Sequence, residues 1–86
     1  MPLQVTLVSA EEAVWTGEAT LVVAKTVIGE IGFMAGHTPM LAILAEGQVR
    51  ITPPEGPKII ANAQDGFISV ENDVVTIVAG EAALVA

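Results

Sequence analysis

Side chains able to do covalent or acid–base chemistry are scarce in this sequence. The chain has one histidine, His37, no cysteine and no tyrosine, and its only serines are Ser9 and Ser69. A hydrolytic triad needs a serine, a histidine and a carboxylate in mutual contact, and the spacing of these residues gives no sign of one. No catalytic nucleophile with its base is therefore predicted.

Carboxylate and glycine patterns are equally poor in chemistry. The acidic pairs Glu11-Glu12 and Glu71 with Asp73 lie among turn-forming residues, where solvated carboxylates are far commoner than paired catalysts. His37 has no second histidine as a metal partner, and the acidic residues do not follow the alternation of a calcium loop. The glycines lack the spacing of a phosphate-binding loop. We expect no catalytic residue, no metal and no cofactor.

The loop Gly36-His37-Thr38-Pro39-Met40-Leu41 is the least ordinary segment, and its residues permit a structural interpretation as well as a functional one. His37 can cap a hairpin by hydrogen bonding to a backbone carbonyl. Met40 and Leu41 can lie in the core as easily as in an interface, and the same ambiguity applies to Trp15, Phe33 and Met34.

Composition limits the possible partners. Ten acidic residues against three basic ones give the 86-residue chain a net charge of −7, which repels nucleic acid and anionic lipid headgroups. The longest apolar run, Met40 to Ala45, is far shorter than the ~20 residues of a membrane-spanning helix. The first residues also lack the features of a secretion signal. We expect a single domain, residues 1–86, that stays inside the cell without inserting into a membrane.

Short apolar segments between turn signals predict β-strands. Leu3, Val5 and Leu7 alternate with polar residues, and no segment has a sustained helical period. Turn signals recur at Glu46-Gly47, Pro53–Pro57, Gln64-Asp65-Gly66, Asn72-Asp73 and Gly80. They separate apolar segments at Leu41–Leu44, Gln48–Thr52, Lys58–Ala63, Phe67–Glu71 and Val74–Ala79. We expect about nine strands in antiparallel hairpins, forming a small sandwich or flattened barrel.

Several motifs, in order, resemble those of a known family, the amino-terminal domain of the ε subunit of F-type ATP synthases. The resemblance covers essentially the whole chain. Its motifs are Val8-Ser9-Ala10-Glu11, Trp15–Ala19, Gly29-Glu30-Ile31-Gly32, Gly36–Leu41, Asp65–Val70 and Val75–Ala79.

This resemblance implies a fold and a function. The fold is an all-β, flattened ten-stranded β-sandwich, or pseudobarrel, if Ala82 to Val85 forms a last edge strand. The function is that of a non-catalytic rotor subunit in the central stalk, which links the γ subunit to the polar loops of the membrane c-ring and couples proton flow to ATP synthesis. The implied location is peripheral, on the cytoplasmic face of the cell membrane.

The resemblance also assigns contact residues. Val27, Ile28, Gly29 and Glu30 match the positions that face the c-ring, where the family's ring loop carries an arginine that could pair with Glu30. The γ side matches a second set of positions, namely His37, Thr38, Pro39, Met40 and Leu41.

Two departures from the family pattern affect these expectations. Ala35 stands where many members have a proline, so the following loop is expected to be less rigid. The C-terminal helical hairpin of the family is absent, because the sequence stops at Ala86. We expect a piece of a longer protein rather than a naturally short one, which binds its partners without inhibiting ATP hydrolysis and without a small-molecule ligand.

A lipoyl- or biotin-carrier-like domain is the alternative from another functional class. Such a domain is also a small acidic β-sandwich, and its function depends on one lysine at a hairpin tip. Lys25 lies between Ala24 and Thr26, and Lys58 follows Pro57, so neither has the expected surroundings.

Overall fold

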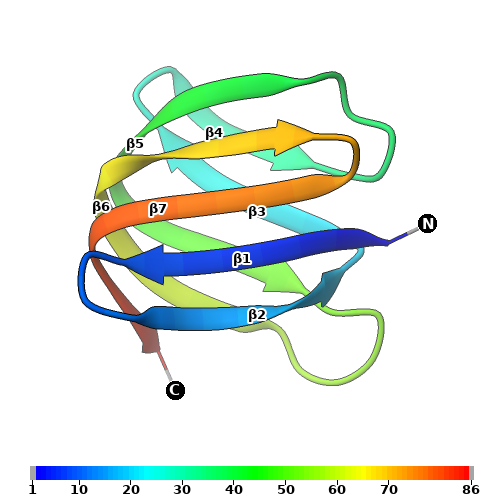
Figure 1. The fold of residues 1–86 in the computed structure, drawn as a ribbon, viewed down its shortest axis with the longest axis horizontal. Helices are drawn as coiled ribbons and strands as arrows, with labels where there is room; N and C mark the ends of the chain where they lie inside the picture. Colours follow the sequence, from blue (N-terminus) through cyan, green and yellow to red (C-terminus); the bar gives the residue numbers. More distant parts are fainter. Residues whose placement is uncertain (1, 86) are drawn as a thin grey trace.

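The computed structural model describes residues 2–85, which contain seven strands and no helix (Figure 1). The strands form one sheet in the order β2-β1-β7-β6-β5-β3-β4. The predicted all-β class is confirmed, and the sheet is consistent with a β-sandwich. The strand bounds are Leu3–Ser9 (β1), Ala13–Ala19 (β2), Leu21–Thr26 (β3), Gly29–Phe33 (β4), Met40–Thr52 (β5), Ile59–Glu71 (β6) and Val74–Val85 (β7).

The strand count is lower than expected. Neither the nine strands predicted from the residues nor the ten implied by the resemblance is confirmed. Each of the long strands β5, β6 and β7 contains two segments that the sequence separated, as β5 contains both Leu41–Leu44 and Gln48–Thr52. Turn-like residues such as Glu46-Gly47 therefore lie inside strands, and they bend the chain without reversing it.

Pairing across the bends explains why the chain does not reverse there. Ile43 lies opposite Phe67 before the bend in β5 and β6, and Gly47 lies opposite Ala63 after it, in the same register. The pairing of β6 with β7 also continues through the bend. Figure 1 shows the three strands curving together at one end of the molecule, from the front layer to the back layer. The sheet thus folds over on itself and encloses its inner face.

The bends also reset which side chains point inward. In β5 the buried positions are Ala42 and Leu44 before the bend and Val49 and Ile51 after it. The step from Leu44 to Val49 is an odd number of residues, which strict alternation does not allow. In β6 the corresponding bend contains Asp65, whose φ of 60° lies in the left-handed region and interrupts the pleat.

Gly66, next to Asp65, is the tightest point of the bend. A Cβ atom at Gly66 would lie 1.7 Å from the carbonyl oxygen of Val78 in β7 and 2.7 Å from the Cα of Ala79. Only glycine therefore fits between the two backbones.

The core fills the space between the two layers. The alternation predicted for β1 is confirmed, because Leu3, Val5 and Leu7 are all buried. Phe33 is the largest fully buried side chain, and the rest of the core is mainly aliphatic, as the shortage of aromatic residues requires. Trp15 packs at the edge of this core, and its ring covers Gly17, which lies inside β2.

Two connections show what the sequence did and did not indicate. Asn72 and Asp73 have φ values of 50° and 60° and form the two-residue turn between β6 and β7, so the predicted turn is confirmed. By contrast, β1 pairs in parallel with β7, with Gln4 opposite Val74 and Ser9 opposite Ala79. A series of antiparallel hairpins does not contain this pairing.

The bend yields a test of stability. We expect Gly66→Ala to lower the free energy of unfolding by at least about 2 kcal/mol, because the new methyl group must displace the backbone of β7. Urea unfolding followed by circular dichroism measures this change. Gly32→Ala is the matched control, since its Cβ would meet nothing closer than 3.7 Å, and it should change stability by less than about 0.5 kcal/mol. Equal stability of the two variants would contradict the packing described.

Candidate functional site

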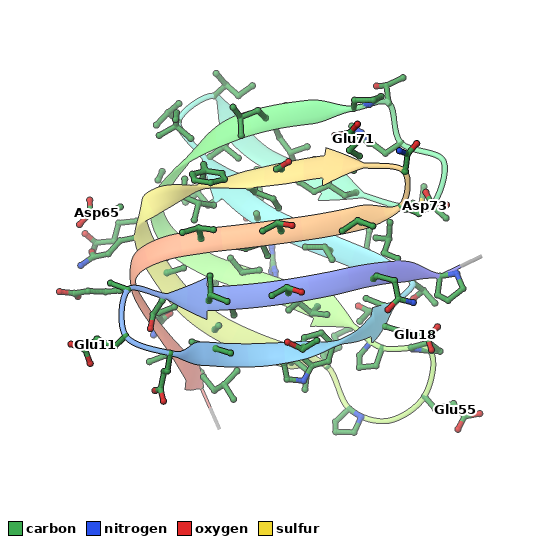
Figure 2. All side chains as sticks on the ribbon, in the orientation of Figure 1. Glu11, Glu18, Glu55, Asp65, Glu71 and Asp73 are labelled. Carbon is green, nitrogen blue, oxygen red and sulfur yellow. The ribbon has the colours of Figure 1, made fainter. Side chains whose placement is uncertain are left out.

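Acidic side chains do not gather into a site. Figure 2 shows Glu11, Glu18, Glu55, Asp65, Glu71 and Asp73 at the periphery of the fold, on several different turns and strand ends. Residues 2–85 hold no group of three or more His, Asp or Glu side chains placed to share a metal ion.

In the same part of the chain, no helix is long and apolar enough to cross a bilayer.

The hairpin between β3 and β4, here called the hairpin tip (Val27–Gly29), presents two large apolar side chains to solvent. Val27 and Ile28 are 65% and 74% exposed. The turn beneath them is well fixed: the hydroxyl of buried Thr26 donates to the carbonyl of Gly29 at 2.7 Å and accepts from the amide of Ile28 at 3.3 Å. Apolar side chains held outward in this way indicate a contact surface.

The hairpin tip is also attached to β5. The amide of Val27 donates to the carbonyl of Ile43 at 3.0 Å. The tip therefore cannot swing freely, and its position depends on the layer that contains β5.

Glu30 lies one residue beyond the hairpin tip, and its carboxylate already has a partner. Arg50 on β5 donates from Nη2 to Oε1 of Glu30 at 2.7 Å. Both side chains are partly exposed, at 41% for Arg50 and 58% for Glu30, so the pair contributes little to stability. It does hold the carboxylate in one direction, at the surface beside the hairpin tip.

The second predicted set, His37 to Leu41, is divided between two places. His37, Thr38 and Pro39 belong to the loop after β4, at the end of that strand remote from the hairpin tip. The His37 ring packs on Phe33, with 5.0 Å between ring centroids, and its Nδ1 lies 2.7 Å from the carbonyl oxygen of Thr38. The predicted hydrogen bond from His37 to a backbone carbonyl is thus present.

This loop is held by the turn between β6 and β7. The amide of Gly36 donates to Oδ1 of Asp73 at 2.7 Å, and the amide of His37 donates to the carbonyl of Met34 at 3.1 Å. Gly36 has a φ of +85°, which glycine adopts without strain.

Met40 and Leu41 begin β5 and face opposite sides of the sheet. Met40 packs against the core, whereas Leu41 is 67% exposed. On the same outer face, Ile43 is 55% and Phe67 is 37% exposed, and these two residues lie directly opposite each other in the sheet. We call Leu41, Ile43 and Phe67 the apolar strip.

Sequence reasoning missed Ile43, Phe67 and Arg50. Alternation within Leu41–Leu44 places Leu41 and Ile43 on one face, but a wholly apolar run does not show which face is covered. The pairing of Arg50 with Glu30 depends on strand register, which the sequence does not give. Among the earlier interface candidates, Phe33 is buried and Met34 is 62% exposed.

Comparison with known proteins identifies the family. The model of the family described as "ATP synthase, Delta/Epsilon chain, beta-sandwich domain" matches residues 2–85. The chain belongs to this family. The identification made from the sequence motifs is therefore confirmed, and the carrier-domain alternative is not supported.

Relatives with the name ATP synthase epsilon chain are similar along most of the sequence. The one from Micrococcus luteus is 48% identical over 82 residues, covering 95% of this chain and 90% of the relative. The one from Streptomyces griseus is 49% identical over 77 residues, covering 90% of this chain. The chain spans only 62% of that relative's length.

Solved structures have the same fold. A chain in the Euglena gracilis mitochondrial ATP synthase, described as OSCP/F1/c-ring in rotational state 1, superimposes with a TM-score of 0.90 at 27% identity, covering 96% of this chain and 53% of that one. A chain in the central stalk and c-ring structure of Tetrahymena thermophila ATP synthase gives a TM-score of 0.79 at 14% identity, covering 95% of this chain and 66% of that one. The latter comparison establishes the fold alone.

The hairpin tip gives a second test. We expect Thr26→Val to destabilise the fold by about 1 to 2 kcal/mol, because it leaves the Gly29 carbonyl and the Ile28 amide without their hydroxyl partner while keeping the side-chain shape. Urea unfolding measures the loss, and amide hydrogen exchange at Ile28 should become faster. Thr76→Val, on the outer face of β7, is the control and should have little effect. Unchanged stability and exchange in the Thr26 variant would contradict the proposed role of this hydroxyl.

Proposed function

We propose that this chain is the β-sandwich part of an ATP synthase ε subunit and acts as a non-catalytic element of the central stalk, linking the γ subunit to the c-ring. Family membership supports this role. The observation that carries it furthest is the arrangement of two exposed apolar surfaces, the apolar strip and the hairpin tip, which meet at Ile43. Such a chain works through its surfaces, in keeping with the scattered carboxylates and the single histidine.

The γ subunit is assigned to the apolar strip. Leu41 belongs to the predicted γ set, and Ile43 and Phe67 extend it over two neighbouring strands. Exposed apolar side chains on adjacent strands provide the apolar centre that stable interfaces usually have. His37, Thr38 and Pro39 lie at the near end of the same strand, so they are placed at the rim of this contact.

The c-ring is assigned to the hairpin tip together with Glu30. Val27 and Ile28 offer apolar contact, and Glu30 offers a negative charge for a basic residue of a ring loop. Arg50 forms part of this arrangement, because a ring arginine must either share the Glu30 carboxylate with Arg50 or displace it. A carboxylate has two oxygens and can accept from two guanidinium groups, so sharing is the simpler outcome.

Coupling requires that the two surfaces move as one body. The hydrogen bond from Val27 to Ile43 joins the hairpin tip directly to the strand that carries the apolar strip. Force applied to one surface is thereby transmitted to the other through a short, hydrogen-bonded path. The proposed role of this chain in rotation depends on the hydrogen bond between Val27 and Ile43.

The proposed location is peripheral, at the cytoplasmic face of the membrane. The net charge of −7 disfavours direct adsorption to anionic lipids. Attachment to the membrane would then depend on the c-ring and on the rest of the stalk.

The γ assignment is tested by mutating the apolar strip. We expect Leu41→Ser combined with Ile43→Ser to weaken binding to the purified γ subunit by at least about tenfold, because both side chains would lose their apolar contacts. Calorimetry or a quantitative pull-down measures the affinity. The control is Leu84→Ser, which removes an apolar side chain that is 50% exposed on the far half of β7. Binding that is reduced by the control but not by the double variant would reject the assignment.

The c-ring assignment is tested by reversing a charge. We expect Glu30→Lys to weaken association with purified c-ring severalfold and to reverse the salt dependence of this contact, because a repulsive contact, which salt relieves, replaces an attractive one, which salt weakens. Glu55→Lys, in the exposed loop between β5 and β6, makes the same charge change elsewhere and should leave binding nearly unchanged. Undiminished ring binding by the Glu30 variant would exclude this residue from the contact.

A further inference from the structure

The first part of β5 is an open strand edge. Residues Met40 to Ile43 pair on one side with Val70 to Phe67 of β6. On the other side, the only backbone hydrogen bond formed within residues 2–85 is the one from the amide of Val27 to the carbonyl of Ile43. Figure 1 shows this part of β5 along the outer margin of the front layer. We call residues 40–43 the open edge.

The direction of the free backbone groups follows from that one hydrogen bond. In an antiparallel ladder the amide and carbonyl of one residue point to the same side, and successive residues alternate. Because the carbonyl of Ile43 points away from β6 toward Val27, the amide of Ile43 and both groups of Leu41 also point away from β6. Within residues 2–85, the open edge therefore leaves the Leu41 amide, the Leu41 carbonyl and the Ile43 amide without a backbone partner.

The open edge is short and follows Pro39, but it lacks the charged side chains and bulges that often prevent strands from pairing with other chains. Protective features include charged side chains, bulges and very short strands. The outer strands carry such features: β2 contains Glu18 and pairs with β1 through a register shift, and β4 contains Glu30 and only five residues. From Met40 to Ala45 there is no charged residue. Leu41 and Ile43, whose side chains are exposed, belong to this uncharged edge.

We propose that an extended segment of the γ subunit adds to the open edge as a further β-strand and places its apolar side chains on Leu41 and Ile43. This inference rests on the proposed function and adds the manner of binding to it. Backbone hydrogen bonds would provide affinity, and the apolar strip would select the side chains of the added strand. Pro39 at one end and the hairpin tip at the other limit the added strand to a few residues.

The test separates backbone pairing from side-chain contact. The full 86-residue chain is prepared by chemical ligation with an ester in place of the amide of Leu41, which removes the N–H donor and keeps the side chain. We expect this ester to bind purified γ subunit about fivefold more weakly than the native chain, as the loss of one hydrogen bond implies. An ester at Glu55, in the loop between β5 and β6, is the control and should bind as the native chain does.

Amide hydrogen exchange provides an independent measurement that does not depend on folding of the ester. We expect γ binding to slow exchange of the Leu41 and Ile43 amides by at least about a hundredfold, because both would become ladder donors. Native binding by the Leu41 ester, together with fast exchange at Leu41 in the complex, would overturn strand addition while leaving the stalk role intact. Absence of any γ binding by the native chain would overturn both.

A second copy of this chain is the other possible occupant of the edge. Sedimentation of the free protein shows whether it self-associates. A dimer whose Leu41 amide is already protected without γ would assign the open edge to self-pairing and overturn the proposal.

Discussion

The joint bend of β5, β6 and β7 is the constraint on which the rest of the structure depends. A small sheet poor in aromatic residues buries enough apolar surface only if its inner face is covered, and here the sheet covers itself. The bend requires Gly66, because the backbone of β7 passes where a side chain would lie, and it places Asp65 in a left-handed conformation. Once the three strands turn together, the remaining strands add to one layer or the other, and Phe33 fills the space between the layers.

The outer surface follows from the same bend. Among residues 2–85, the front half of β5 has β6 on one side and only the hairpin tip on the other, so this part of the chain leaves its uncharged edge and the apolar strip exposed. The hairpin tip contacts this edge through the Val27 to Ile43 hydrogen bond, so the hairpin tip and Leu41 adjoin one strand, whereas His37, Thr38 and Pro39 lie in the loop before it. The proposed stalk role uses this continuity, because a hydrogen bond joins the backbone of the hairpin tip to that of β5.

Local signals and long-range pairing differ in how well the sequence indicated them. Asn72-Asp73 was correctly predicted as a turn, because Asn and Asp tolerate the positive φ of a tight turn and here stand between two apolar segments. Glu46-Gly47 and Gln64-Asp65-Gly66 have the same local appearance but lie inside bent strands, because their neighbours continue to pair across the bend. Met40 and Leu41 are adjacent and both apolar, yet one packs on the core and the other is exposed, and only the face that the sheet encloses distinguishes them.

By itself the sequence determined the all-β class and the family, because composition, alternation and ordered motifs are properties of the chain as written. Tertiary structure alone decided that three strands are bent and continuous, that Arg50 holds Glu30, and that Leu41, Ile43 and Phe67 share one exposed face. These features depend on which segments distant in sequence become neighbours. The two-residue turn at Asn72-Asp73 sets the register of β6 with β7 locally, whereas the register between strands distant in sequence, such as β1 with β7, depends on burial of the whole inner face.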